Sequence, residues 1–300
     1  MTTHTAESLA RDLCALGLPR GAVVLVHTSL SAIGWVEDGP ATVITALRRA
    51  VGEEGTMVMP THTTNLTDPG LWRNPPAPPE QWERIRAEMP PYDPATSPTR
   101  GMGFVAETFW RMPGVLRSPH PITSVAAQGP QAVSITSRHG LDVQGEMGLE
   151  SPFGRIYELD GWVLLLGVDM TRNTSVHLAE VIAEVPYWHP FRIPMQQGDQ
   201  KAWVEGRGHA ECSNGFERLT PLLDAQGIVR YGKVGDAPSR LMRQRALVDT
   251  AVQLLRQDPL VLLCPASTCE TCDRARAFLG RQPSYAEAAA WVWSGGANEA

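Results

Sequence analysis

The chain alternates between short apolar runs and longer amphipathic stretches. Three apolar runs have strand length and no polar interruption, at residues 22–26, 56–59 and 162–168. Two amphipathic stretches of helical period lie before and between them, at residues 5–17 and 40–51. A continuous apolar run predicts a strand that is buried on both faces, and helices between such strands cover the sheet. The pattern therefore predicts the α/β class, with a central mixed sheet flanked by helices.

The second half of the chain carries further predicted elements. Short strands are predicted at residues 203–206 and 228–231. Residues 239–256 have apolar side chains at helical spacing, which predicts a long amphipathic helix. Arg240 and Arg243 should then lie, together with Arg245, on its solvated side.

One strand, turn and helix carry most of the functional interpretation. The third apolar run is followed by a polar turn at residues 169–173 and by a helix that Thr174 or Ser175 would cap through its hydroxyl. His177 and Glu180 are three residues apart in this helix, so they share one face near the carboxyl end of the strand. Ligands bind at that end of such sheets, whereas an isolated histidine on a helix is more often structural.

Three polar, glycine-bearing turns follow apolar segments and are candidates for ligand binding. They comprise residues 27–34, 101–103 and 118–124. Hydroxyls and exposed N–H groups in such turns can bind a phosphate or an amide-bearing ligand, and glycine lets the backbone come close to it. Ordinary surface turns have a similar composition, so these turns alone do not identify a ligand.

Residues 60–98 interrupt the pattern with many prolines. The prolines exclude a continuous strand or helix apart from a helix at residues 81–89. The aromatic residues of this segment predict that it packs over the protein as a lid or a binding wall. We expect one domain over residues 1–284 with this lid-like insertion, and a C-terminal tail over residues 285–300.

Composition favours an ordinary soluble globular protein. The chain has 300 residues, of which 43% are hydrophobic and 19% charged, and a formal net charge of −6. No apolar run approaches the roughly 18 residues of a membrane span, and the first residues lack a secretory pattern, so we expect a cytoplasmic protein without a membrane partner. The negative charge disfavours a nucleic-acid partner and leaves small molecules as the expected partners.

Five cysteines are too few and too scattered for a disulfide framework in a chain of this length. Cys264, Cys269 and Cys272 lie close together, and a C-x-x-C pair can be half of a zinc site. No fourth ligand follows them at a typical spacing. We therefore expect small buried thiols and no bound metal, with zinc binding as the less favoured alternative.

Several sequence blocks together resemble one known family. They are VLVHTSLSAIGWVEDGP, GTMVMPTHT, RSPHPITSVAAQG, SPFGRIYEL and LLLGVDMTRNTSVHLAE, followed by GKVGDAPSRL and CETCDRAR. Their order and spacing are similar to those of the aminoglycoside 3-N-acetyltransferase family from about Leu9 to Arg276. The resemblance implies an αβ fold distinct from the common acetyltransferase fold, whose pyrophosphate loop needs Arg or Gln where Pro98 stands. It also accounts for the insertion, a variable segment beside the substrate cleft in this family.

The resemblance implies an acyltransferase that uses acetyl-CoA as its cosubstrate. The acceptor it implies is the 3-amino group of the 2-deoxystreptamine ring of aminoglycoside antibiotics, whose acetylation confers resistance. Similar proteins acetylate other amines, so a different amine substrate is an alternative, and a protein that only sequesters amines is another. A zinc hydrolase is disfavoured because the chain lacks H-E-x-x-H. The oligomeric state, monomer or homodimer, stays open.

Within that family, roles follow for the candidate residues. His177 is expected to be the general base, with Glu180 or Glu211 orienting its ring. Asp169, Glu180 and Glu211 are expected to attract the cationic substrate. Backbone N–H groups of residues 27–31 are expected to stabilise the oxyanion, and transfer should be direct because no cysteine lies in a nucleophile motif. The residues expected to bind acetyl-CoA are His27, Thr28, Ser29, Ser31, Gly34, Gly101, Met102, Gly103, Ser118, His120 and Ser124.

Overall fold

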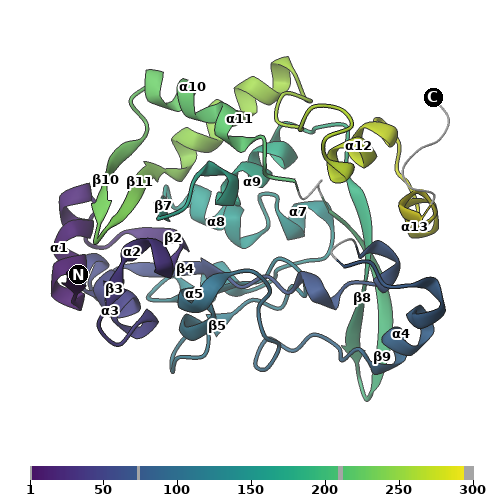
Figure 1. Cartoon of the computed structure of the whole chain (residues 1–300), viewed down its shortest axis with the longest axis horizontal. Helices are drawn as coiled ribbons and strands as arrows, with labels where there is room; N and C mark the ends of the chain where they lie inside the picture. The colour runs from purple at the N-terminus through teal and green to yellow at the C-terminus, as the bar shows by residue number, and fades with distance from the viewer. Residues whose placement is uncertain (1, 73–74, 209–211, 294–300) are drawn as a thin grey trace.

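A seven-stranded mixed sheet runs through the molecule (Figure 1). The computed structural model describes residues 2–72, 75–208 and 212–293. In spatial order the strands are β10 (Arg230–Val234), β11 (Ala237–Arg243), β7 (Trp162–Leu166), β2 (Val23–Thr28), β4 (Thr56–Pro60), β6 (Val125–Gln128) and β5 (Leu116–Arg117). The central strands β7, β2 and β4 are parallel, and the outer strands pair in antiparallel fashion. The predicted α/β class with a mixed sheet is confirmed.

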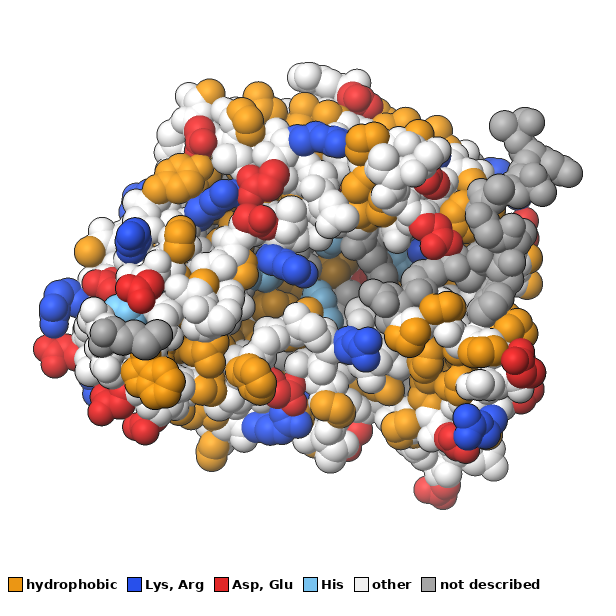
Figure 2. All heavy atoms as spheres, viewed as in Figure 1, with side chains coloured by type: hydrophobic (Ala, Val, Ile, Leu, Met, Phe, Trp, Pro, Cys, Tyr) orange, Lys and Arg blue, Asp and Glu red, His pale blue; other side chains and the backbone are white. Residues whose placement is uncertain are grey.

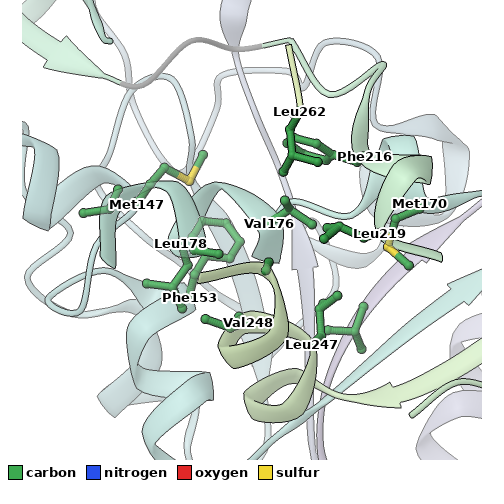
Figure 3. Packing of buried hydrophobic residues seen from close by; sticks show 14 of the residues in the cluster. Met147, Phe153, Met170, Val176, Leu178, Phe216, Leu219, Leu247, Val248 and Leu262 are labelled. Atoms are coloured by element: carbon green, nitrogen blue, oxygen red, sulfur yellow. The ribbon is translucent and has the colours of Figure 1, made fainter. Parts of the chain in front are cut away.

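Helices cover both faces of the sheet because its central strands are apolar on both sides. Alternate side chains of a strand point to opposite faces, so Val24 and Val26 join one core cluster and Leu25 joins the other. The first cluster lies under α1 (Ala6–Leu16), α3 (Pro40–Val51) and α5 (Gly103–Phe109). The second lies under α6 (Ala132–Thr136), α8 (Pro152–Glu158), α9 (Ser175–Ile182) and α11 (Gln244–Gln257). Figure 3 shows part of this second cluster, with Val176 of α9 and Leu247 of α11 among its members.

The first two long helices lie where the apolar periodicity predicts them. Thr5 caps α1 through a reciprocal capping box with Ser8, and Gly17 ends the helix in the left-handed region at φ +97°. Helix α3 starts at Pro40, where the missing N–H costs nothing. Local sequence is sufficient to fix these two elements.

The remaining elements are short and lie at the edges of the sheet or outside it. They are β1 (Thr3–His4), α2 (Leu30–Ile33), β3 (Trp35–Val36), α4 (Trp82–Glu88), α7 (Val143–Glu146), α10 (Thr220–Ala225), α12 (Glu270–Ala277), α13 (Tyr285–Trp293) and five 3-10 turns, η1 (Thr64–Leu66), η2 (Pro69–Leu71), η3 (Pro79–Gln81), η4 (Met170–Arg172) and η5 (Phe216–Leu219). Within residues 2–72, 75–208 and 212–293, no helix has both the length and the apolar character needed to cross a membrane.

The proline-rich insertion packs against a separate hairpin. Strands β8 (His189–Gln197) and β9 (Gln200–Gly208) form this hairpin, and Figure 1 shows α4 beside it. Leu66 and Met89 of the insertion are buried in a small cluster that Trp203 of β9 covers. Lys201 of β9 donates hydrogen bonds to three backbone carbonyl groups near the end of α4, including that of Met89 at 2.9 Å. The predicted helix and the predicted packing of the insertion are both present, whereas the sequence indicated only part of the hairpin.

The predicted helix over residues 239–256 is wrong in its first turn. Residues up to Arg243 belong to β11, where Leu241 pairs with Leu164 of β7, and α11 begins only at Gln244. Ser239 and Leu241 are buried while Arg240 is not, which is the alternation of a strand. The apolar spacing of the true helix happens to continue backwards into this strand, so periodicity alone placed Arg240 on a helix.

Two further predictions differ from the structure near the ends of elements. The hydroxyl of Thr174, a predicted cap of α9, makes no hydrogen bond to the first turn of that helix. Oδ1 of Asn173 instead accepts a hydrogen bond from the amide of Ser175 at 3.2 Å. The segment expected to be a tail from residue 285 begins with helix α13. Tyr285 of that helix donates a hydrogen bond to the buried carboxylate of Asp68.

Asp68 joins three separate segments and should be important for stability. Its carboxylate is fully buried and accepts from Arg86 at 2.9 Å and from Tyr285, and it lies 3.5 Å from Arg192. Removing one partner of a buried pair leaves uncompensated charge, so Asp68→Ala should lower the free energy of unfolding by about 3 kcal/mol in urea titrations. Arg11→Ala, which breaks an exposed pair with Glu7, should cost at most about 0.5 kcal/mol and serves as the control. Equal stabilities of the two variants would contradict this role of Asp68.

Candidate active site

The ends of β2 and β7 bring two of the predicted functional segments together at one edge of the sheet. The amide of Ser29, just after β2, donates to the carbonyl oxygen of Leu166 at the end of β7, at 2.9 Å. Gly167 follows β7 with φ +70°, and a Cβ built there would lie 2.5 Å from the Cβ of Ala32. Only glycine allows this approach, which holds α2 against the turn that leads to α9.

His177 and Glu180 form a hydrogen-bonded dyad on the first turns of α9. Nδ1 of His177 lies 2.6 Å from Oε2 of Glu180, and the hydroxyl of Tyr187 donates to Oε1 of the same carboxylate at 3.0 Å. Burial and the negative charge of Glu180 raise the pKa of Tyr187, so its phenol stays a donor. The carboxylate is 1% exposed and the imidazole 12% exposed. Nε2 of His177 makes no hydrogen bond to any residue that the structure describes.

The dyad also settles which carboxylate touches the imidazole among the described residues. Glu180 accepts at Nδ1, and the ring of Phe216 packs edge-on against His177 at 4.9 Å between centroids. Glu211, the other predicted orienting residue, lies outside the described residues. Its predicted roles in orientation and substrate binding therefore stay predictions.

Other histidines gather in the interior near the same sheet edge, and Figure 2 shows histidine side chains at the bottom of a central hollow. His27 is the next-to-last residue of β2, and burial followed by the charge of His62 lowers its pKa to about 3. Burial also lowers the pKa of His139 to about 3. The rings of His120 and His139 lie 4.6 Å apart. These imidazoles are therefore neutral at pH 7.

The hydrogen bonds of His120 fix its tautomer. Nδ1 accepts from the amides of Ile122 at 3.2 Å and Thr123 at 3.0 Å, so the proton of the neutral ring is on Nε2. Nε2 is buried and has no hydrogen-bond partner among the described residues. A ring held in this way can donate to a ligand or to water, but it has no free lone pair with which to act as a base.

The predicted coenzyme turns are only partly available to a ligand. Gly103 lies against Thr28, with 3.7 Å between its built Cβ and the carbonyl oxygen of Thr28, and Gly101 faces open space. Ser31 is exposed, and its hydroxyl lies 3.1 Å from that of Ser29. The structure thus brings the first two predicted turns together around β2 and the start of α5.

Other members of the predicted coenzyme set are engaged within the protein. Ser118 is fully buried between His139 and the amide of Val125, and the hydroxyl of Ser124 donates to the carbonyl oxygen of Thr61. Gly34 has φ +92°, but a Cβ there would meet Asp236 rather than open space. Ser118 and Ser124 are buried and support the turns from inside, so they offer no surface for direct contact with a coenzyme, whereas Gly34 is half-buried.

A cavity of about 860 Å³ opens beside Ser29 and the turn after β7. Arg172 and Lys233 line it and are exposed, and neither has a salt bridge to a residue in the described part of the chain. Arg240 also lines it and pairs with Glu217 at 2.9 Å, and Glu217 accepts from the amide of Met170 at 2.8 Å. Asp169, predicted to attract a cation, lies in the same lining. Three basic side chains beside one aspartate suit an anionic group better than a cationic one.

A second cavity, of about 360 Å³, lies on the side of the insertion. Trp72 and Asn65 of the insertion line it together with Phe191 of β8 and Thr271 and Arg274 of α12. Residues of the insertion thus line this cavity, and their predicted role as a lid or a binding wall stays a prediction.

Sequence reasoning missed Tyr187, Lys233 and Arg240. No sequence pattern around Tyr187 indicates its contact with Glu180, because Tyr187 lies in the irregular segment after α9. Arg240 was noticed but placed on a helix, and only the pairing of β11 with β7 turns it toward the cavity.

The comparisons with known proteins agree with this architecture. The family model described as aminoglycoside 3-N-acetyltransferase matches residues 25–256. Aminoglycoside N(3)-acetyltransferase IV from Salmonella is 40% identical over 258 residues, which is 86% of this chain and 89% of the relative. A solved structure of an AAC(3)-IVa variant in complex with a gentamicin is 38% identical, with a TM-score of 0.80 and coverage of 92% of this chain and 98% of the other. AAC-IIIb in a binary complex with CoASH is 31% identical, with a TM-score of 0.77 and coverage of 85% and 97%.

The buried neutral histidines predict acid sensitivity. An unfolded imidazole binds a proton near pH 6.5, whereas folded His139 binds one only near pH 3, so folding loses stability as the pH falls below 6.5. Lowering the pH from 7 to 5 should cost roughly 2 kcal/mol for each such histidine in denaturant titrations. His139→Gln should flatten the pH dependence by about that amount. Ser118→Ala, which removes a hydrogen bond to the ring but keeps the imidazole, should lower stability equally at both pH values; an unchanged slope in His139→Gln would refute the assignment.

Proposed function

The chain belongs to the aminoglycoside 3-N-acetyltransferase family, and we propose that it transfers the acetyl group of acetyl-CoA to the 3-amino group of a 2-deoxystreptamine ring. The observation that carries the proposal is the His177–Glu180 dyad at the sheet edge of a chain that matches this family over residues 25–256. Relatives bound to a gentamicin and to CoASH support both classes of ligand. Acetylation removes the positive charge of the amine, so the reaction would protect a cell from the antibiotic.

His177 acts as the general base in this proposal. The amine of an aminoglycoside is largely protonated near neutral pH, so a proton must leave before nitrogen can attack the thioester. Nδ1 of His177 bonds to Glu180, which leaves Nε2 to accept that proton. The buried carboxylate then stabilises the imidazolium, as the orienting acid does in other catalytic triads. His177 passes this first proton to solvent, and the neutral amine attacks the thioester carbonyl to form a C–N bond and a tetrahedral oxyanion. The nitrogen then loses its second proton to Nε2 of His177. As the oxyanion collapses and the C–S bond breaks, His177 gives this second proton to the departing thiolate.

The transfer is direct in this proposal. None of the described cysteines lines the large cavity, and Cys14 is exposed on α1. The amide of Ser29 is already bonded to Leu166, so the amides of Leu30 and Ser31 at the start of α2 are the donors left for the oxyanion. Amine and acetyl-CoA must therefore be bound together before the acetyl group moves.

The large cavity is the proposed place for the charged part of acetyl-CoA. Arg172, Lys233 and Arg240 supply positive charge beside Ser29, and the phosphates of the coenzyme supply the matching negative charge. Oδ1 of Asp169 accepts from the amide of Thr171 at 3.0 Å and from its hydroxyl, so in this proposal Asp169 shapes the turn rather than attracts the aminoglycoside. The acceptor is assigned to the side of the insertion, from which Asn65 and Trp72 line the smaller cavity.

A screen of the purified protein tests the function directly. Acetyl-CoA should give thiol release with at least one of gentamicin, neomycin and apramycin, and mass spectrometry should find a single added acetyl group. Initial rates with both substrates varied should give intersecting double-reciprocal lines, because both must be bound at once. Aminoglycoside binding without turnover would refute the proposal, and parallel lines with label retained on the protein would refute direct transfer.

His177→Ala tests the proposed base. Loss of a general base should lower kcat at least about a hundredfold, while the melting temperature and the affinity for coenzyme A stay near those of the wild type. Glu180→Gln should shift the acidic limb of the kcat profile to lower pH, because a neutral side chain stabilises the imidazolium less. His120→Gln is the matched control and should keep kcat within about tenfold, since Nδ1 of His120 is already occupied. A larger loss in His120→Gln than in His177→Ala would reverse the assignment.

A further inference from the structure

Four cysteines from separate parts of the sequence converge at one point. Cys212 follows the β8–β9 hairpin, Cys264 lies in the loop before α12, and Cys269 and Cys272 lie at the start of α12. All four sulfur atoms are within 4.8 Å of one another. The sulfur of Cys212 is 3.6 Å from that of Cys264 and 3.5 Å from that of Cys269. The fourth ligand that the sequence lacked downstream is thus supplied from 52 residues upstream of Cys264.

We propose that Cys212, Cys264, Cys269 and Cys272 together bind one zinc ion. Zinc bonded to four thiolates at about 2.3 Å in a tetrahedron places the sulfur atoms about 3.8 Å apart, which matches the separations observed. A disulfide would need about 2.05 Å between two sulfurs. Soft thiolate ligands in a tetrahedral arrangement select zinc among the common divalent metals. With all four positions filled by protein, the ion has no open position for water and is structural.

The surroundings of the cluster favour bound thiolates. The amide of Cys264 donates to the sulfur of Cys272 at 3.2 Å. Cys269 and Cys272 also lie at the N-terminal end of α12, where the helix dipole stabilises negative charge. Arg276 of the same helix donates to the carbonyl oxygen of Cys264 and so fixes the loop that carries this ligand. Such outer contacts orient the ligands of metal sites.

The zinc ion would connect segments that lie next to the proposed active site. Tyr187 donates to Glu180 of the dyad, and the carbonyl oxygen of the preceding residue, Pro186, accepts from the amide of Gly280, shortly after α12, at 2.8 Å. Phe216, which packs on His177, is four residues after Cys212. Thr271 of α12 lies between two of the ligands and lines the smaller cavity. Zinc would thereby hold α12 and the chain before η5 in one arrangement beside both the base and the proposed acceptor side.

Metal analysis of the full-length protein, freed of any affinity tag, tests the site without reference to activity. Plasma mass spectrometry should find one zinc per chain after dialysis against metal-free buffer. Cys212→Ser and Cys272→Ser should lose most of it, whereas Cys14→Ser, which alters the exposed cysteine outside the cluster, should retain all of it. Removal of the zinc by a chelator at high temperature should lower the melting temperature of the wild type. Acetyl transfer is measured separately.

Two measurements on the wild-type chain keep the proposal testable if a cysteine variant fails to fold. Titration with a mercurial reagent should modify the exposed Cys14 without releasing zinc and should release the zinc as the four cluster thiols react. Refolding with cobalt should give the visible bands of a tetrahedral tetrathiolate. Absence of stoichiometric metal, iron in place of zinc, or disulfides among these cysteines in mass spectra of alkylated peptides would each overturn the proposal. Loss of acetyl transfer with zinc retained would count against the proposed function alone.

Discussion

The parallel pairing of β2 with β7 is the interaction on which the proposed site depends. Leu25 lies opposite Val163, and His27 opposite Leu165, in strands that are buried on both faces. A slip of one residue would exchange the side chains of the two core clusters, so the register is strongly specified. Parallel strands deliver their following turns to the same edge, and the hydrogen bond from Ser29 to Leu166 fixes how those turns meet.

The buried carboxylate of Glu180 shows how this framework supports chemistry. A carboxylate without partners in the interior would cost several kcal/mol, and here hydrogen bonds from His177 and Tyr187 offset that cost. The same two hydrogen bonds restrict the rotation of the imidazole, so the direction in which Nε2 of His177 points is fixed. A site built on the first turns of a packed helix is more rigid than one built on a loop. The hydrogen bonds that make burial of the Glu180 carboxylate tolerable are thus the ones that orient His177.

Local signals predicted much of the fold and the dyad. Apolar runs, helix caps and the three-residue spacing of His177 and Glu180 are all set within a few residues of sequence. Contacts between residues that are far apart in the sequence could not be predicted from such local patterns. Arg240 faces the large cavity only because β11 pairs with β7. The hydroxyl of Ser118 is hydrogen-bonded to His139, 21 residues away in the sequence. Cys212 contacts Cys264, which is 52 residues away in the sequence. Each depends on which strands and loops become neighbours, a property that periodicity does not record.

The side of the molecule assigned to the acceptor is held by directional contacts more than by apolar area. The two large core clusters belong to the sheet and its helices, whereas the insertion and the hairpin share only small clusters around Leu66 and Phe191. Burial of a few such side chains contributes only several kcal/mol, so it specifies position weakly. Asp68, Lys201 and the cysteine cluster instead tie these segments at single points. Because the residues between such ties contribute little to the core, the proposed acceptor wall can change in shape and sequence while the sheet, the proposed coenzyme cavity and the dyad stay in place.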